Sequence, residues 1–262
     1  MRIKMKVFTG KMVDIKAGSF LMGYDYVYDP KDKIQRFYHE EQPVHKVTLT
    51  AFQMSATLIT QAQYKAITGE YPSTFKGDDL PVTNIGATDA LKFCNKLSEA
   101  EGFTPVFDEK PGSYTSGKCD FSKNGFRIPT EAEWEYACRA GSQTHFNTGN
   151  LESDLAESAW YIKNSGGKTH PVGQKAPNAW GLFDMHGNVW EQCYDGMPQD
   201  TGGYEYTPED QKDPAWDQYF DLRVMRGGGW FSEAWDCRSA LRSSFWTGGG
   251  NYYIGFRIVR RP

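Results

Sequence analysis

The sequence of 262 residues has no excess of positive charge and no apolar run long enough to cross a membrane. Its formal net charge is -4, and acidic and basic residues are interspersed. No basic stripe is therefore present that could neutralise a nucleic-acid backbone. We expect no nucleic-acid partner and no transmembrane segment. The basic start of the chain also lacks an apolar run of signal-peptide length.

Metal-binding and disulfide patterns are equally scarce. The five cysteines form no C-x-x-C pair and are odd in number, which argues against a zinc ribbon and a complete disulfide framework. We expect most of them to be buried as small apolar residues. No two histidines have the i, i+4 spacing of a helical metal site, and the motifs H-E-x-x-H and G-x-S-x-G are absent. The sequence thus has no signature of a metalloprotease or a serine hydrolase.

Aromatic residues and glycine are abundant instead. Aromatics make up 15% of the chain and glycine occurs 27 times, which favours a compact fold rich in loops over a helical bundle. Alternation of apolar and polar residues over 44–55 predicts a strand. Capping boxes and helical periodicity predict helices over 60–68, over 88–101 and from Thr130 to Gly141. Beyond Gly141 the periodicity fades, and no linker marks a domain boundary.

Several ordered motifs resemble the formylglycine-generating enzyme superfamily, also called the sulfatase-modifying-factor domain. They are "RIPTEAEWEYACRAG", "NAWGLFDMHGNVWE", "RVMRGGGW" and "GFRIVRRP", and the earlier "MVDIKAGSFLMG" and "LPVTNIGATDALKFCNKLSE" fit the same pattern. The resemblance covers Met12 to Pro262. It implies one α+β domain over residues 1–262, with a C-type-lectin-like core, many loops and little regular secondary structure.

Asp184 and Glu191 flank a turn that could point carbonyl groups inward, and a hard cation prefers such oxygen ligands. From spacing alone, two carboxylates on a solvated loop are the simpler interpretation. The family resemblance implies a structural calcium ion here. Its ligands would be the side chains of Asp184 and Glu191 and the carbonyl groups of Gly187 and Val189.

The oxidases of this family hold copper(I) with two cysteines in a C-x-x-x-x-C pattern soon after a Gly-Gly pair. In this sequence the two positions are Ser232 and Cys237. A serine hydroxyl is a poor substitute for a copper-binding thiolate. The related iron-dependent sulfoxide synthases take their ligands from an added helical domain, which this chain lacks. We therefore expect no enzyme activity, no copper and no iron, and we expect Cys237 to be a buried framework residue.

The segment from Gly229 to Tyr253 has aromatic residues that follow neither a strand period nor a helix period. Rings mixed with Ser, Gly, Asn and Asp are typical of recognition surfaces, because the rings bury large areas and the small polar residues supply adaptable hydrogen bonds. The composition therefore predicts a ligand-binding surface.

This segment also resembles the variable proteins of diversity-generating retroelements, of the spirochaete type, which display mutable residues at the C-terminal end of a lectin-like fold. The resemblance implies a variable segment over residues 223–257, with a fixed framework of Arg226, Cys237, Arg238, Ala240, Arg242, Gly255 and Arg257. The display positions would be Met225, Gly229, Phe231, Ser232, Glu233, Trp235, Asp236, Leu241, Phe245, Trp246, Tyr252 and Tyr253.

We thus expect a non-enzymatic, receptor-like or adhesin-like monomer that binds an unknown protein or glycan. Such a protein would act at the cell surface, through a signal or lipid anchor ahead of this sequence; the cytoplasm is the alternative. Three other functions stay open: an oxygen-dependent oxidase, a paralogue with one fixed ligand whose rings pack under a loop, and a module that docks another protein.

Overall fold

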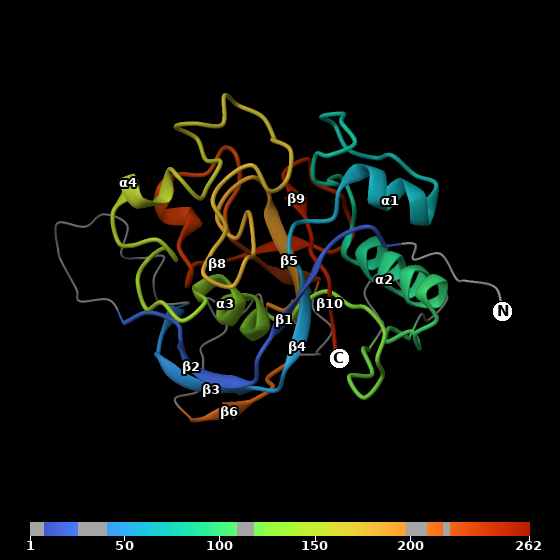
Figure 1. The fold of residues 1–262 in the computed structure, drawn as a ribbon, viewed down its shortest axis with the longest axis horizontal. Helices are drawn as coiled ribbons and strands as arrows, with labels where there is room; N and C mark the ends of the chain where they lie inside the picture. Colours follow the sequence, from blue (N-terminus) through green and yellow to red (C-terminus); the bar gives the residue numbers. More distant parts are fainter. Residues whose placement is uncertain (1–7, 26–40, 109–117, 198–208, 217–220) are drawn as a thin grey trace.

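The computed structural model describes residues 8–25, 41–108, 118–197, 209–216 and 221–262. Short strands and helices are separated by long loops (Figure 1), and the strands have two to seven residues each. The expected α+β fold with little regular secondary structure is confirmed. The basic start of the chain, residues 1–7, lies outside the described residues.

Within the described residues, ten strands form three small sheets. The strand orders are β1-β4-β10, β2-β3-β6 and β8-β7-β5-β9. Since β10 pairs with β4, the end of the chain joins the sheet that contains its first strand. The strands are β1 (Met12–Ile15), β2 (Gly18–Met22), β3 (His45–Leu49), β4 (Phe52–Ser55), β5 (Trp190–Gly196), β6 (Gln211–Lys212), β7 (Leu222–Arg226), β8 (Arg242–Trp246), β9 (Ile254–Gly255) and β10 (Val259–Arg260).

The prediction of one strand over residues 44–55 is wrong in one respect. The segment forms two strands, β3 and β4, which belong to different sheets. The break falls at Thr50, whose backbone N–H and side-chain hydroxyl both donate to Oδ1 of Asp213, at 2.7 and 3.1 Å. That carboxylate replaces the strand partner of Thr50 and lets the chain turn into the next sheet.

The three predicted helices are present, as α1 (Gln61–Thr68), α2 (Ala87–Glu101) and α3 (Glu131–Arg139), with a further short helix α4 (Glu152–Leu155) and a 3₁₀ helix η3 (Ala234–Cys237). The capping boxes at Thr60 and Thr130 are both formed. The helix α3 ends before the predicted Gly141, because Ala140 already has a left-handed backbone with φ of 46°. None of these helices in the described ranges is long and apolar enough to cross a membrane.

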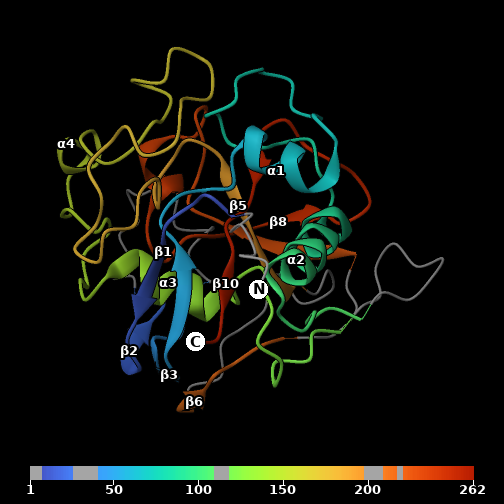
Figure 2. The same ribbon diagram turned by 45° about the vertical axis from the view of Figure 1, so that its right-hand side comes forward.

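Two large apolar clusters hold these elements together. One packs α1 and α2, which lie side by side in Figures 1 and 2, against Phe256 and Ile258 near the end of the chain. The other surrounds Trp134 of α3 and joins it to strands of all three sheets. The five cysteines are free and buried, as expected. These clusters support the sheet β8-β7-β5-β9, which contains part of the C-terminal segment.

Candidate ligand-binding cleft

In the C-terminal segment 223–257, residues of β7, η3 and β8 and the residues just before β9 border an open cleft of about 470 Å³. Seven of the twelve predicted display residues line it: Met225, Phe231, Ser232, Asp236, Leu241, Tyr252 and Tyr253. The remaining lining residues are Trp190, Met197, Arg242, Ser243 and Ser244. Residues at the two ends of β5, in β7, in the loop that leads into η3, around β8 and just before β9 thus meet at one site.

The floor of the cleft is apolar and well packed. Trp190, Met225 and Leu241 are 6 to 8% exposed and belong to one buried cluster with Phe245 and Ile254. Met225 lies opposite Ser243 in the antiparallel pairing of β7 with β8, so the sheet itself forms this surface. A floor built on paired strands holds its shape when residues on the rim are exchanged.

The rim is a group of aromatic rings in mutual contact. The ring centroids of Trp230 and Phe231 are 5.1 Å apart, those of Phe231 and Tyr253 5.0 Å, and those of Tyr252 and Tyr253 5.3 Å. Phe231 and Tyr252 are nevertheless 38% and 47% exposed. Phe75, from the loop between α1 and α2, adds an edge-on contact to Trp230 at 5.8 Å. These rings steady one another while they offer apolar surface to solvent.

Five predicted display residues lie outside the cleft lining: Gly229, Glu233, Trp235, Phe245 and Trp246. Phe245 is 4% exposed and packs beneath the floor, where burial rather than ligand contact explains it. Gly229 is also buried, and a Cβ atom there would lie 3.3 Å from Cδ1 of Trp190. Trp246 is 61% exposed, at the end of β8.

The two positions that correspond to the copper-binding cysteines do not provide a copper(I) site. The Ser232 hydroxyl accepts a hydrogen bond from the Gly229 N–H at 3.0 Å. Cys237 is fully buried, and burial raises the pKa of its thiol far above the usual value. One hydroxyl and one protonated thiol lack the pair of soft thiolates that copper(I) requires. The residues present therefore do not fit this metal.

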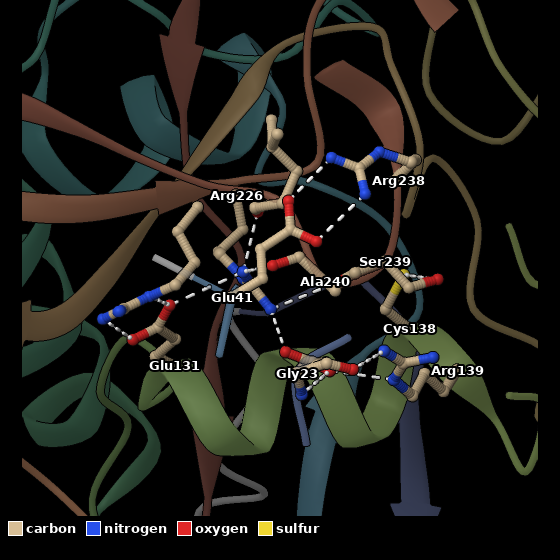
Figure 3. Close-up of polar contacts among 12 residues, drawn as sticks. Gly23, Glu41, Glu131, Cys138, Arg139, Arg226, Arg238, Ser239 and Ala240 are labelled. Carbon is tan, nitrogen blue, oxygen red and sulfur yellow. Dashed lines mark hydrogen bonds and ion pairs between the residues drawn. The ribbon is translucent and has the colours of Figure 1, made fainter. Parts of the chain in front are cut away.

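The predicted framework arginines are anchored by buried ion pairs, and Figure 3 shows the polar contacts of two of them, Arg226 and Arg238. Arg226 of β7 donates to the carboxylate of Glu135 in α3 and to the carbonyl oxygens of Ser239 and Ala240, at 3.0 and 2.6 Å. The other three pairs are bidentate and join Arg238 to Glu41, Arg242 to Glu131 and Arg257 to Glu191, with N–O distances of 2.6 to 3.0 Å.

Each of these four glutamates lies outside the 223–257 segment, so the segment is tied to the rest of the fold at its two ends and in its middle. Gly255 is held in a different way. A Cβ atom at this position would lie 2.7 Å from the carbonyl oxygen of Val82, which leaves room for glycine alone.

Of the two carboxylates predicted to bind calcium, Asp184 has the more suitable surroundings. It is buried, accepts a hydrogen bond from the Gly173 N–H at 2.8 Å, and forms no ion pair within the described residues. Burial raises the pKa of Asp184 to about 6. A calcium ion would supply the missing positive charge.

Glu191 fits calcium less well, because Arg257 already binds both of its oxygens. The ion would have to share this carboxylate, and it would depend on the carbonyl groups of Gly187 and Val189. In the described parts of the chain no three or more His, Cys, Asp or Glu side chains are grouped so that they could hold a metal. The calcium site thus stays a proposal with one suitable carboxylate.

Several residues at the cleft were not predicted from the sequence. Ser243 and Ser244 carried a signal, since they are small polar residues between framework Arg242 and the end of the segment. Trp190, Met197 and Phe75 carried none. They come from distant stretches that the tertiary fold brings to the cleft.

Comparisons with known proteins find similarity both to enzymes and to a variable protein. The family model for the sulfatase-modifying factor enzyme 1-like domain matches residues 4–262. A chaperone protein, LppX, of Paenibacillus barcinonensis is 30% identical over 82% of this chain and 81% of its own length. The formylglycine-generating enzyme of Mycobacterium tuberculosis is 28% identical over 69% of this chain and 72% of its own length.

Among solved structures, the variable protein 1 of Treponema denticola superposes with a TM-score of 0.84 and 31% identity. The match covers 96% of this chain and 95% of that protein. The extended match to the family model and these likenesses agree with the motifs found along the sequence. The chain belongs to the sulfatase-modifying factor enzyme 1-like domain family.

Proposed function

We propose that this chain is a non-enzymatic binding protein that displays a diversified ligand surface from residues 223–257. One observation carries the proposal: seven predicted display residues line a single open cleft, while the framework arginines lie in buried ion pairs. The likeness to Treponema denticola variable protein 1 supports it.

This separation of roles is what a variable surface requires. Substitution on an exposed rim changes stability little, whereas the loss of a buried charge partner is costly. Phe231 and Tyr252 are more than a third exposed, whereas Arg226 in the same segment is fully buried. Ligand contacts can therefore change while the anchors of the segment stay intact.

Oxidase activity is the second candidate, because formylglycine-generating enzymes also match this chain. The pair of Ser232 and buried Cys237 argues against it, as two thiolates are needed at these positions. A paralogue with one fixed ligand would use the same cleft without variation. Binding to a protein or glycan and a cell-surface location remain predictions.

A direct test is to immobilise the protein and select binders from a displayed peptide library and a glycan array. Binding should be lost when Phe231 and Tyr252 are both changed to Ala. Trp246→Ala is the matched control, since this exposed ring lies outside the cleft lining. Ligands that bind both variants equally, or copper-dependent turnover of a cysteine peptide, would contradict the proposal.

A further inference from the structure

We infer that the cleft binds a positively charged group carried on an apolar stem. The chemistry fits the side chain of a lysine or arginine in a protein ligand, and equally a small organic ammonium ion. The inference rests on the proposed function, because it names the ligand class for the same cleft. It follows from the charged groups, the aromatic rings and the apolar floor that line the cleft.

The rim of the cleft is aromatic. Phe231, Tyr252 and Tyr253 line the cleft and contact one another at 5.0 and 5.3 Å between centroids. The face of an aromatic ring carries partial negative charge and attracts a cation that approaches within about 6 Å of its centroid. Several rings around one opening can therefore surround a positive group.

Asp236 contributes a carboxylate that has no ion-pair partner among the described residues. Asp236 is half-buried in η3 and lines the cleft, and no ion pair in the described part of the chain involves it. The nearby guanidinium of Arg238 is bound by both oxygens of Glu41. Asp236 accepts a hydrogen bond from the Glu233 N–H at 3.2 Å, which fixes its orientation. Burial raises the pKa of Asp236, as expected where its charge is uncompensated.

Arg242 is the cationic residue among the described residues that line the cleft. Arg242 donates to both oxygens of Glu131, at 2.6 and 2.8 Å, and is buried with it. The charge of Arg242 is thus neutralised by Glu131, which lies outside the cleft lining. Glu233, next to the cleft and exposed, adds further negative charge. Among the described residues of the lining, a bound anion would meet the carboxylate of Asp236 and no cation that is free of a carboxylate partner, so the local charge favours a positive ligand.

The floor of the cleft is apolar. Met197, Met225 and Leu241 are 4 to 8% exposed and give the cleft an apolar base. Such a surface buries the methylene stem of a long side chain while the charged head stays at the polar rim. A volume of about 470 Å³ leaves room for one such side chain together with neighbouring atoms.

The test is an NMR titration of the full chain with cationic probes and neutral analogues of matched shape. N-acetyl-lysine amide is compared with N-acetyl-norleucine amide for a protein source, and choline with 3,3-dimethylbutanol for a small ammonium source. At least one cation should bind about fivefold or more tightly than its analogue, and the pair that shows this preference identifies the source. Asp236→Asn, which keeps an oxygen for the Glu233 N–H, should abolish the preference. Glu99→Gln, which removes an exposed carboxylate of α2 outside the cleft lining, is the control and should retain the preference.

Three results would overturn the inference. The neutral analogues could bind as tightly as the cations, the preference could survive in Asp236→Asn, or neither cation could shift the resonances of cleft residues. The proposed function is judged separately. If the neutral analogues bind and Phe231→Ala abolishes this, the cleft is a ligand site of another specificity, and only the cationic class fails.

Discussion

The guanidinium of Arg226 donates to the carboxylate of Glu135, and both side chains are 0% exposed. Arg226 is in β7, near the start of the C-terminal segment 223–257, and Glu135 is in α3, in the middle of the capped helix. Glu135 also accepts from Arg139 at 2.8 Å and from the Gly23 N–H at 2.9 Å. The carboxylate therefore joins three parts of the chain.

Removal of this carboxylate should be costly. Glu135→Gln should lower the free energy of unfolding by about 3–5 kcal/mol, because Arg226 and Arg139 would keep their buried charges without a shared partner. Urea unfolding measures the change. Lys163→Ala is the control, since its pair with Glu152 is exposed and should contribute no more than about 1 kcal/mol. Equal, small losses in both variants would show that the buried pair does not anchor the segment.

The rim and the floor of the cleft should respond differently to truncation. Phe231→Ala and Tyr252→Ala should each cost about 1 kcal/mol or less, because their rings are more than a third exposed. Phe245→Ala should cost about 3–5 kcal/mol, since this ring is 4% exposed and leaves a cavity under the floor. Thermal unfolding separates the two classes. A large loss at Phe231 would make the rim part of the core and argue for packing under a loop.

Sequence reasoning succeeded where the determinants are local. The helix α3 follows from Thr130 and Glu133, which lie three residues apart and form the capping box as predicted. The strand over 44–55 was misjudged because the residue that interrupts it, Asp213, is 163 positions away from Thr50.

The same limit applies to the cleft. Its rim residues could be predicted from composition, but the partners of its arginines could not, since Arg238 and Glu41 are 197 positions apart. Phe245 shows the converse error. Its aromatic ring was counted with the displayed residues, yet it is 4% exposed and packs into the buried cluster beneath the floor.

His186 should make the fold sensitive to acid. Burial lowers its pKa to about 4, whereas an exposed histidine titrates near 6.5. Between these values the unfolded chain binds a proton that the folded chain does not, so stability is lost as the pH falls from about 6.5 to 4. His186→Gln, which can still donate to the Cys237 carbonyl and accept from the Asn147 N–H, should show a shallower loss over this range. Identical pH profiles for the two proteins would exclude this histidine as the cause.

Calcium should stabilise the protein through Asp184. Because its pKa is raised to about 6, the folded chain holds a proton there that the unfolded chain has lost. In the absence of a cation, this group makes stability fall as the pH rises from about 4 to 6. A bound calcium ion removes that penalty, and at a hundredfold excess over its dissociation constant it adds about 2.7 kcal/mol.

The measurement is the melting temperature at pH 7 with calcium and after chelation. Calcium should raise it by several degrees in the native chain and have no effect in Asp184→Asn. Magnesium is the ionic control. An unchanged melting temperature after chelation would argue against the site and leave Arg257 as the sole countercharge for Glu191.

Substitutions should be tolerated at the exposed rim of the cleft and rejected at the buried framework residues, both in the laboratory and in natural variation. In a scan of all substitutions over 223–257 with protease resistance as the readout, Phe231 and Tyr252 should accept most residues, because their rings are exposed. Gly255 and Arg238 should accept almost none, since the first has the Val82 carbonyl oxygen in the place of a Cβ and the second balances the buried charge of Glu41. Sequencing the end of this gene across colonies from one culture gives the natural counterpart. Changes confined to the rim would support a diversified receptor. An invariant gene with a tolerant rim would favour a paralogue that keeps one ligand, because the fold would then permit variation that the organism does not generate.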